Sequence, residues 1–177
     1  MAIHIETIRR GQGLMNRDVL EKISEWERRL FGTTRVVQTH TFERTGYCNV
    51  LVYSDTQLVS FLTTIRRQAL FDEQRVILGG VSSVMTPPEH QGNGYASRAV
   101  REAERIIFDD IGADCGALLC EERLLPFYER LGWKAVTCRV EITQPSGKVM
   151  WPERIMLLSK AGVVWQPGTV DLCGLPF

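Results

Sequence analysis

The sequence lacks segments that would carry a chain into or across a membrane. Its first residues contain no basic segment followed by an apolar run, so we expect no signal peptide. No stretch approaches the roughly 20 consecutive apolar residues needed to span a bilayer. We therefore expect a cytoplasmic protein that does not have a membrane as its partner.

An excess of charge of either sign is also missing. Lys plus Arg number 21 and Asp plus Glu number 21, which gives a formal net charge of zero. Proteins whose main partner is nucleic acid or an anionic membrane usually carry a basic surplus. The charge balance therefore predicts no nucleic-acid partner.

Cysteine pairs with the spacing of metal ligands are absent. The five cysteines are irregularly spaced, and no Cys-x-x-Cys occurs among them. Structural zinc sites usually draw on such closely spaced pairs. We expect free thiols in a reducing compartment, behaving as small apolar side chains, and no metal.

What the sequence does have is enough apolar material for one core. Apolar residues make up 44% of the 177 residues and charged residues 24%, close to the average for globular proteins. This length suits one domain spanning residues 1–177. Residues 163–177 form an apolar tail that contains Trp, Leu and Phe, and we expect it to be ordered without regular structure.

The order of predicted elements indicates a mixed α/β domain. Asn16 can cap a helix that starts at Arg17 and ends at Gly32. Runs rich in β-branched and apolar residues then predict strands, and residues 96–111 have the periodicity of an amphipathic helix. A short helix follows from Pro126 to Gly132. The predicted strands cover residues 49–54, 57–65, 67–71, 75–86, 115–120, 134–143 and 154–159.

Residues 84–96 (VMTPPEHQGNGYA) join the end of a strand to the start of this amphipathic helix. The first N–H groups of a helix have no partner within it and sit at the positive end of the helix dipole. Gly92 and Gly94 let the backbone approach an anion closely because they lack a Cβ atom. The loop therefore predicts a phosphate or pyrophosphate site.

Three other kinds of loop also join a strand to a helix. A plain strand-to-helix turn also uses glycine, which is a common turn residue. A Walker loop needs Lys followed by Ser or Thr after its second glycine, and Tyr95-Ala96 stands there instead. A dinucleotide fingerprint needs a third glycine, which this loop does not have.

Two motifs resemble those of the GNAT acetyltransferase superfamily. Gln91-x-x-Gly94-x-Ala96 is similar to its acetyl-CoA signature, [Gln/Arg]-x-x-Gly-x-[Gly/Ala]. Residues 125–133 (LPFYERLGW) are similar to its aromatic-Tyr-x-x-x-Gly-[Phe/Trp] segment. The order and the separation of the two motifs also fit that family. The resemblance covers residues 1–160 and is firmest over residues 79–136.

The resemblance implies a fold and a cofactor cleft. It implies a central, mostly antiparallel sheet with flanking helices, in which the family's strands four and five splay apart to admit acetyl-CoA. Coenzyme A is then a co-substrate, with its pyrophosphate at the glycine loop and its pantetheine arm along the end of strand four. The implied cofactor-binding residues are Val84, Met85, Thr86, Gln91, Gly92, Asn93, Gly94, Tyr95 and Ala96.

A narrower resemblance concerns the acceptor. Residues 65–67, 80–91 and 128–133 look similar to aminoglycoside 2'-N-acetyltransferases. The tail segment 165–171 resembles that group and the nodulation N-acyltransferases. Ser82 occupies a strand-four position where such enzymes often carry a Glu. The resemblance implies an amine acceptor, with aminoglycoside-like molecules as one class.

The resemblance also implies catalytic roles. Tyr128 is the acid that protonates the sulfur of departing CoA, and a backbone N–H of Val84 or Met85 holds the oxyanion. For the base, three hypotheses stay open. It is Glu89, which is otherwise an ordinary surface carboxylate; or His90; or a water held by Ser82 or Ser83.

Other functions also stay open at this stage. The acceptor can be a peptide or protein amine, or the donor a longer acyl-CoA. A non-catalytic acyl-CoA sensor is a further alternative. The presence of Tyr128, the expected catalytic acid, argues against it. The tail at 163–177 is a candidate for forming a homodimer and completing the acceptor pocket.

Overall fold

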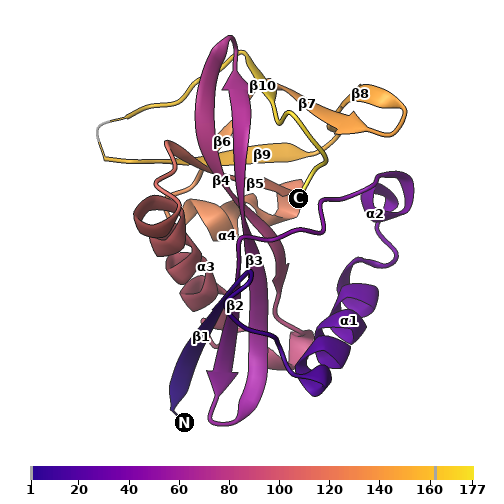
Figure 1. Cartoon of the computed structure of the whole chain (residues 1–177), viewed down its shortest axis with the longest axis vertical. Coiled ribbons are helices and arrows are strands. Elements are labelled where there is room, and N and C mark those ends of the chain that lie inside the picture. The colour runs from indigo at the N-terminus through magenta and orange to yellow at the C-terminus, as the bar shows by residue number, and fades with distance from the viewer. Residues whose placement is uncertain (1, 162) are drawn as a thin grey trace.

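A computed structural model describes residues 2–161 and 163–177 as a mixed α/β fold, as predicted (Figure 1). Its strands are β1 (Ile3–Arg9), β2 (Cys48–Ser54), β3 (Gln57–Phe71), β4 (Gln74–Met85), β5 (Cys115–Cys120), β6 (Lys134–Val136), β7 (Arg139–Gln144), β8 (Gly147–Met150), β9 (Arg154–Ser159) and β10 (Thr169–Asp171). Its helices are α1 (Arg17–Phe31), α2 (Arg35–Thr39), α3 (Tyr95–Arg105) and α4 (Leu125–Glu129), with short 3-10 turns η1 (Pro88–His90) and η3 (Glu122–Leu124) and a π turn η2 (Ile106–Asp110).

The described strands join in one sheet of ten. Its main path runs β6-β9-β5-β4-β3-β10-β7-β8, and β2 and β1 extend from the other part of β3. Only β4 with β5 and β7 with β10 run parallel among these pairs. The predicted mostly antiparallel sheet with flanking helices is therefore confirmed.

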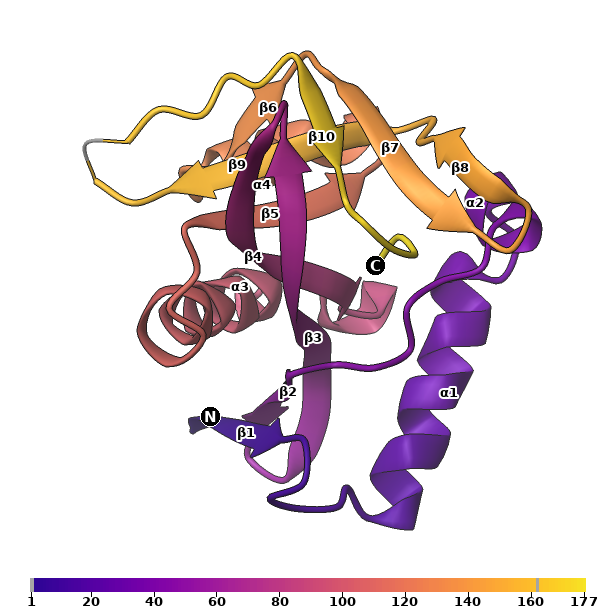
Figure 2. The same cartoon turned by 45° about the horizontal axis from the view of Figure 1, so that its top comes forward.

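Helices α1 and α3 cover opposite faces of this sheet (Figure 2). Successive side chains of a strand point to opposite faces, and β2 illustrates this. Val50 and Val52 pack in the cluster under α3, whereas Leu51 packs in the cluster under α1. None of the helices in the described ranges has the length and apolar character needed to cross a bilayer.

Helix α1 forms where the sequence predicts it. Asn16 accepts a hydrogen bond from the Val19 N–H at 2.8 Å and so caps the helix. Gly32 closes the helix through its N–H, which donates to the Arg28 carbonyl. Ile23 and Trp26 face inward and are buried, so α1 is fixed against β2, β3 and the end of β4.

Two strand predictions were wrong. Residues 57–71 form the single strand β3, since no Gly or Pro interrupts them and β4 pairs along most of their length. Conversely, residues 134–143 split into β6, which pairs with β9, and β7, which pairs with β8 and β10. The chain thus crosses to a different part of the sheet after β6.

The prediction of a tail without regular structure was also wrong in part. Within residues 163–177, β10 inserts between β3 and β7, with Val170 paired to both Phe71 and Val140. Val170 and Leu172 are fully buried, and Phe177 is nearly so. The tail is therefore part of the sheet and of the core.

Candidate functional site

The site begins where β4 and β5 separate. These parallel strands pair over four positions, from Leu78 opposite Cys115 to Val81 opposite Leu118. In the described structure no cross-strand pair joins them beyond that point, although β4 continues to Met85 and β5 to Cys120. The predicted splay is therefore present, and it leaves backbone groups of both strands open to a ligand.

A β-bulge in β4 lies inside this splay. Thr63 pairs with Ser82 and Phe61 with Met85, so Leu62 faces two residues of β4, Ser83 and Val84. Ser83 adopts a φ of 51°, in the left-handed region that residues other than glycine rarely occupy. A bulge leaves one residue out of the ladder and redirects its neighbours. Here it leaves backbone groups near Val84 free to face the splay.

The glycine loop connects this strand end to α3. Gly92 and Gly94 have φ values of 78° and 75°, a left-handed conformation that glycine adopts at little cost. The side chains of Gln91 and Asn93 hold the loop from within: Gln91 donates to the Thr86 carbonyl at 2.9 Å, and Asn93 to the carbonyls of His90 and Gln91. These two side chains thus shape the loop.

The N-terminus of α3 points out of this loop with its N–H groups unused. Gly94 occupies the N-cap position, and no side chain caps the helix. In the described residues, the N–H groups of Gly92 to Ala96 make no turn or loop hydrogen bond. Tyr95 is packed in the core and Ala96 is small. The loop and the first turn therefore offer backbone donors to an anion.

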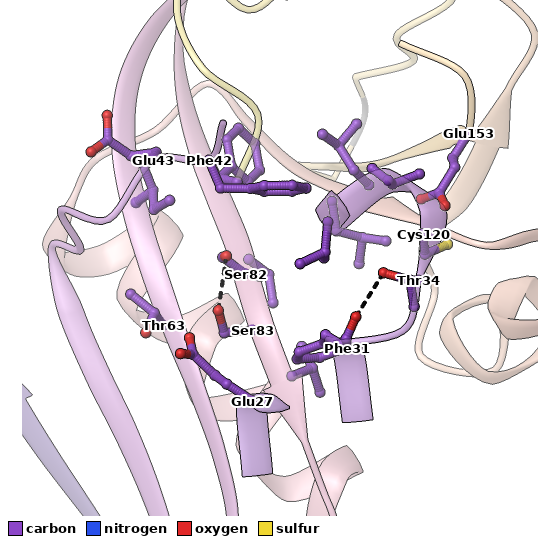
Figure 3. Close-up of a pocket in the computed structure, with 18 of the residues that line it drawn as sticks. Glu27, Phe31, Thr34, Phe42, Glu43, Thr63, Ser82, Ser83, Cys120 and Glu153 are labelled. Carbon is purple, nitrogen blue, oxygen red and sulfur yellow. Dashed lines mark hydrogen bonds between the residues drawn. The ribbon is translucent and has the colours of Figure 1, made fainter. Parts of the chain in front are cut away.

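A cavity of about 310 Å³ adjoins the splay (Figure 3). Its floor is the end of β4 and β5, and its other walls come from α1, the segment 34–46, α4 and the loop before β9. Ser82 and Ser83 point into it from β4. The volume is in the range of small-molecule sites.

Tyr128 lines this cavity from α4. Its ring is buried and stacks edge-on against Phe127 and Trp133, with centroids 4.8 and 6.4 Å away. Burial, and secondly the Cys120 thiol, raises the pKa of Tyr128 above its ordinary value. The hydroxyl makes no hydrogen bond to any residue described in the structure. A neutral phenol without a protein partner thus faces the cavity.

The sequence-predicted residues fall into two groups. The structure brings Tyr128, Ser82 and Val84 together around the cavity, and the Ser82 hydroxyl lies 3.4 Å from that of Ser83. The Met85 side chain is fully buried under α1, so only the Met85 backbone can contact a ligand. The Thr86 hydroxyl is 2.8 Å from that of Ser60, which ties β4 to β3.

Glu89 lies apart from this group. It does not line the cavity; its carboxylate receives two hydrogen bonds from Arg29 of α1, at 2.8 and 2.9 Å. The Arg29 hydrogen bond lowers the pKa of Glu89 to about 2. A carboxylate so readily ionised and already paired is poorly suited to take a proton at neutral pH. The geometry therefore weighs against Glu89 as the base.

Sequence reasoning missed three carboxylates of the cavity, Glu27, Glu121 and Glu153. Glu27 lies four residues after Ile23, on the inward side of α1, and a charge within an apolar stripe was a usable signal. Glu153 lies in a bend before β9 and follows no periodic pattern. Only the folded chain places it beside β5.

The comparisons with known proteins fit this geometry. Residues 14–136 match the family described as the acetyltransferase (GNAT) domain. The match covers more than half of the chain, so the chain belongs to the GNAT family. It is an acyl-CoA-dependent N-acyltransferase. A search among curated proteins gives no significant match.

Several solved structures share the fold. An acyl-CoA N-acyltransferase from Pseudomonas aeruginosa has 14% identity and a TM-score of 0.60, with 89% of this chain and 100% of that chain covered. ElaA from Escherichia coli has 12% identity and a TM-score of 0.61, covering 90% and 100%. A GNAT family acetyltransferase from Brucella melitensis, solved with acetyl-CoA, has 17% identity and a TM-score of 0.55, covering 93% of each chain.

Proposed function

We propose that this chain transfers the acetyl group of acetyl-CoA to a primary amine of a small-molecule acceptor. The observation that carries the proposal is one continuous path. It runs from the free N–H groups at the start of α3, along the splayed end of β4, to the cavity that contains Tyr128.

The donor end of this path suits acetyl-CoA. The N–H groups from Gly92 to Ala96 would hold its pyrophosphate. Backbone groups of Val84, Met85 and Thr86 would pair with the pantetheine arm, since β5 does not pair with this part of the chain. The bulge at Ser83 and Val84 supports the expected oxyanion contact, because it turns backbone N–H groups away from β3.

Tyr128 would then act as the acid. Attack by a neutral amine forms the C–N bond and breaks the C–S bond, and the leaving sulfur needs a proton. A phenol whose pKa is raised by burial keeps its proton until that moment. A water held by Ser82 stays a proposal for relaying protons, supported by the position of Ser82 on the cavity wall.

The cavity also bears on the acceptor. Its volume and its partly aromatic walls, which include Phe42 and Trp151, favour a small molecule over a protein surface. Aminoglycoside-like molecules remain one class to test. We also propose a cytoplasmic location, which five free cysteines would suit.

The test is CoA release from acetyl-CoA against a panel of aminoglycosides, polyamines, aryl-alkyl amines, amino acids and peptides. We expect one class of small amines to release CoA well above the rate without amine. Release only with peptides would favour the peptide alternative. Binding of acetyl-CoA with no release for any amine would favour a sensor and contradict the proposal.

A further inference from the structure

One carboxylate of the cavity has no basic partner. Glu153, half-buried in the bend before β9, lines the cavity beside Cys120 (Figure 3). Over residues 2–161 and 163–177 it makes neither a hydrogen bond nor an ion pair. The other carboxylates of the cavity are paired: Glu27 with Arg44, Glu43 with Arg67, and Glu121 with Arg123. Glu153 is therefore the carboxylate available to a ligand.

Glu153 and the expected acid, Tyr128, line the same cavity. β5 pairs with β9 up to Cys120 opposite Arg154, so Glu153 stands just beyond the end of β5. The thiol of Cys120 is near both groups: its pKa is raised to about 12 by burial and then by Glu153, and it in turn raises the pKa of Tyr128. Glu153 and Tyr128 thus face one cavity, which the Cys120 thiol also lines.

The charges around Glu153 favour its protonated form. Burial raises the pKa of Glu153, and the neighbouring Glu121 raises it further. Arg154, which follows Glu153 in the chain, is paired with Glu122, and Arg123 is paired with Glu121. A carboxylate with a raised pKa is a better proton acceptor near neutral pH than an ordinary one.

The same loop supplies a second unused polar group. Trp151 is 6% exposed and lines the cavity, and its indole N–H has no hydrogen-bond partner among the described residues. Its ring contacts Phe42 edge-on at 6.0 Å. A buried donor without a partner costs free energy, and a polar ligand would remove that cost. The Glu153 side of the cavity therefore combines an aromatic wall, a free donor and a free carboxylate.

We propose that Glu153 binds the ammonium group of the acceptor and removes the proton that this group must lose before it attacks. The proposal rests on the proposed acetyl transfer. The ammonium gives one proton to the Glu153 carboxylate, which later releases it to water. The neutral nitrogen forms the C–N bond as the C–S bond breaks. Tyr128 protonates the sulfur and regains a proton from the nitrogen, so the products are the amide, CoA and one proton.

The kinetic test compares Glu153→Gln with Glu73→Gln, a matched change at an exposed residue in the turn between β3 and β4, outside the cavity. At saturating acetyl-CoA we expect Glu153→Gln to lower kcat/KM for the best amine about 100-fold, the scale of general-base catalysis. It should also remove the acidic limb of the pH profile, while Glu153→Asp recovers part of the rate and Glu73→Gln stays within about twofold. An acidic limb that persists in Glu153→Gln would overturn the proposal.

A binding test examines the role of Glu153 without measuring turnover. With CoA in place of acetyl-CoA, the wild type should bind 2-phenylethylamine more tightly than 2-phenylethanol. Glu153→Gln should lose that preference, and Glu73→Gln should keep it; equal preference in all three proteins would overturn the proposal. If no amine releases CoA from the wild type, the proposed function is contradicted. The binding comparison then still tests whether Glu153 holds an ammonium group.

Discussion

At the scale of single residues, Tyr128 couples stability to its proposed chemistry. Burial raises its pKa above the ordinary value of about 10. At a pH between the unfolded-state pKa and the folded-state pKa, Tyr128 is ionised in the unfolded chain but still protonated in the folded chain. The contribution of Tyr128 to stability is therefore complete below pH 10 and is lost as pH rises through the folded-state pKa.

Tyr128→Phe removes this titration. We expect the free energy of unfolding to fall between pH 9 and pH 11 more steeply in the wild type than in the variant, by up to about 1.4 kcal/mol per pH unit. Urea unfolding at several pH values measures both slopes. Cys115 and Cys120, whose pKa values are also raised, titrate in both proteins and cancel in the comparison. Parallel slopes would contradict the burial argument.

Single residues also mark the limit of sequence reasoning at this site. Tyr128 and Ser82 were identified through their places in motifs, and both line the cavity. Glu89 was chosen for its nearness in sequence to the glycine loop, but in the fold it pairs with Arg29 on α1. Glu153 is 25 residues after Tyr128 and belongs to no motif. Its place beside β5 depends on strand pairing that the sequence does not reveal.

At the scale of elements, the loop before α3 depends on one backbone conformation. Gly94 has a φ of 75°, and a Cβ added there would have no heavy atom within 4 Å. An alanine at this position would therefore not clash with a neighbour. It would, however, have to adopt the left-handed conformation, which costs about 1–2 kcal/mol for residues other than glycine. Asparagine tolerates this conformation better.

We expect Gly94→Ala to weaken acetyl-CoA binding about tenfold, because the loop must either keep the unfavourable left-handed conformation or move its N–H groups away from the ligand. Gly94→Asn, the matched control, should weaken it less. Calorimetric titration with acetyl-CoA measures both dissociation constants. An unchanged constant in Gly94→Ala would show that the left-handed conformation is not needed for binding.

Elements differ in how far the sequence determines them. α1 followed from local signals, a capping Asn16 and an apolar stripe, which act within one turn. Residues 134–143 carry no break as strong as a proline, yet they divide because β6 and β7 join different partners. The β7–β8 hairpin was missed although Pro145, Ser146 and Gly147 are typical turn residues.

At the scale of the whole molecule, the tail closes the sheet. β10 pairs with β3 on one side and with β7 on the other, so it joins the two parts of the sheet. Phe177 also lines the cavity. We infer that residues 163–177 fold together with the rest of the chain as one domain, and that unfolding occurs in a single transition.

Leu172→Ala tests this inference. Leu172 is fully buried in the core, and such truncations cost about 2–5 kcal/mol. Val164 is 70% exposed, so Val164→Ala in the same tail should change stability by less than about 0.5 kcal/mol. Urea unfolding followed by tryptophan fluorescence and by circular dichroism gives both values. A separate, early transition in Leu172→Ala would contradict a single domain.

The central claim is that Tyr128 acts as the acid in acetyl transfer from acetyl-CoA bound at the splay of β4 and β5. The most direct measurement is the rate of CoA release by Tyr128→Phe, with saturating acetyl-CoA and the best amine of the panel, beside the dissociation constant for acetyl-CoA. The account predicts a kcat lowered about 10-fold or more with an unchanged dissociation constant. An undiminished kcat in a variant that binds acetyl-CoA normally would contradict it.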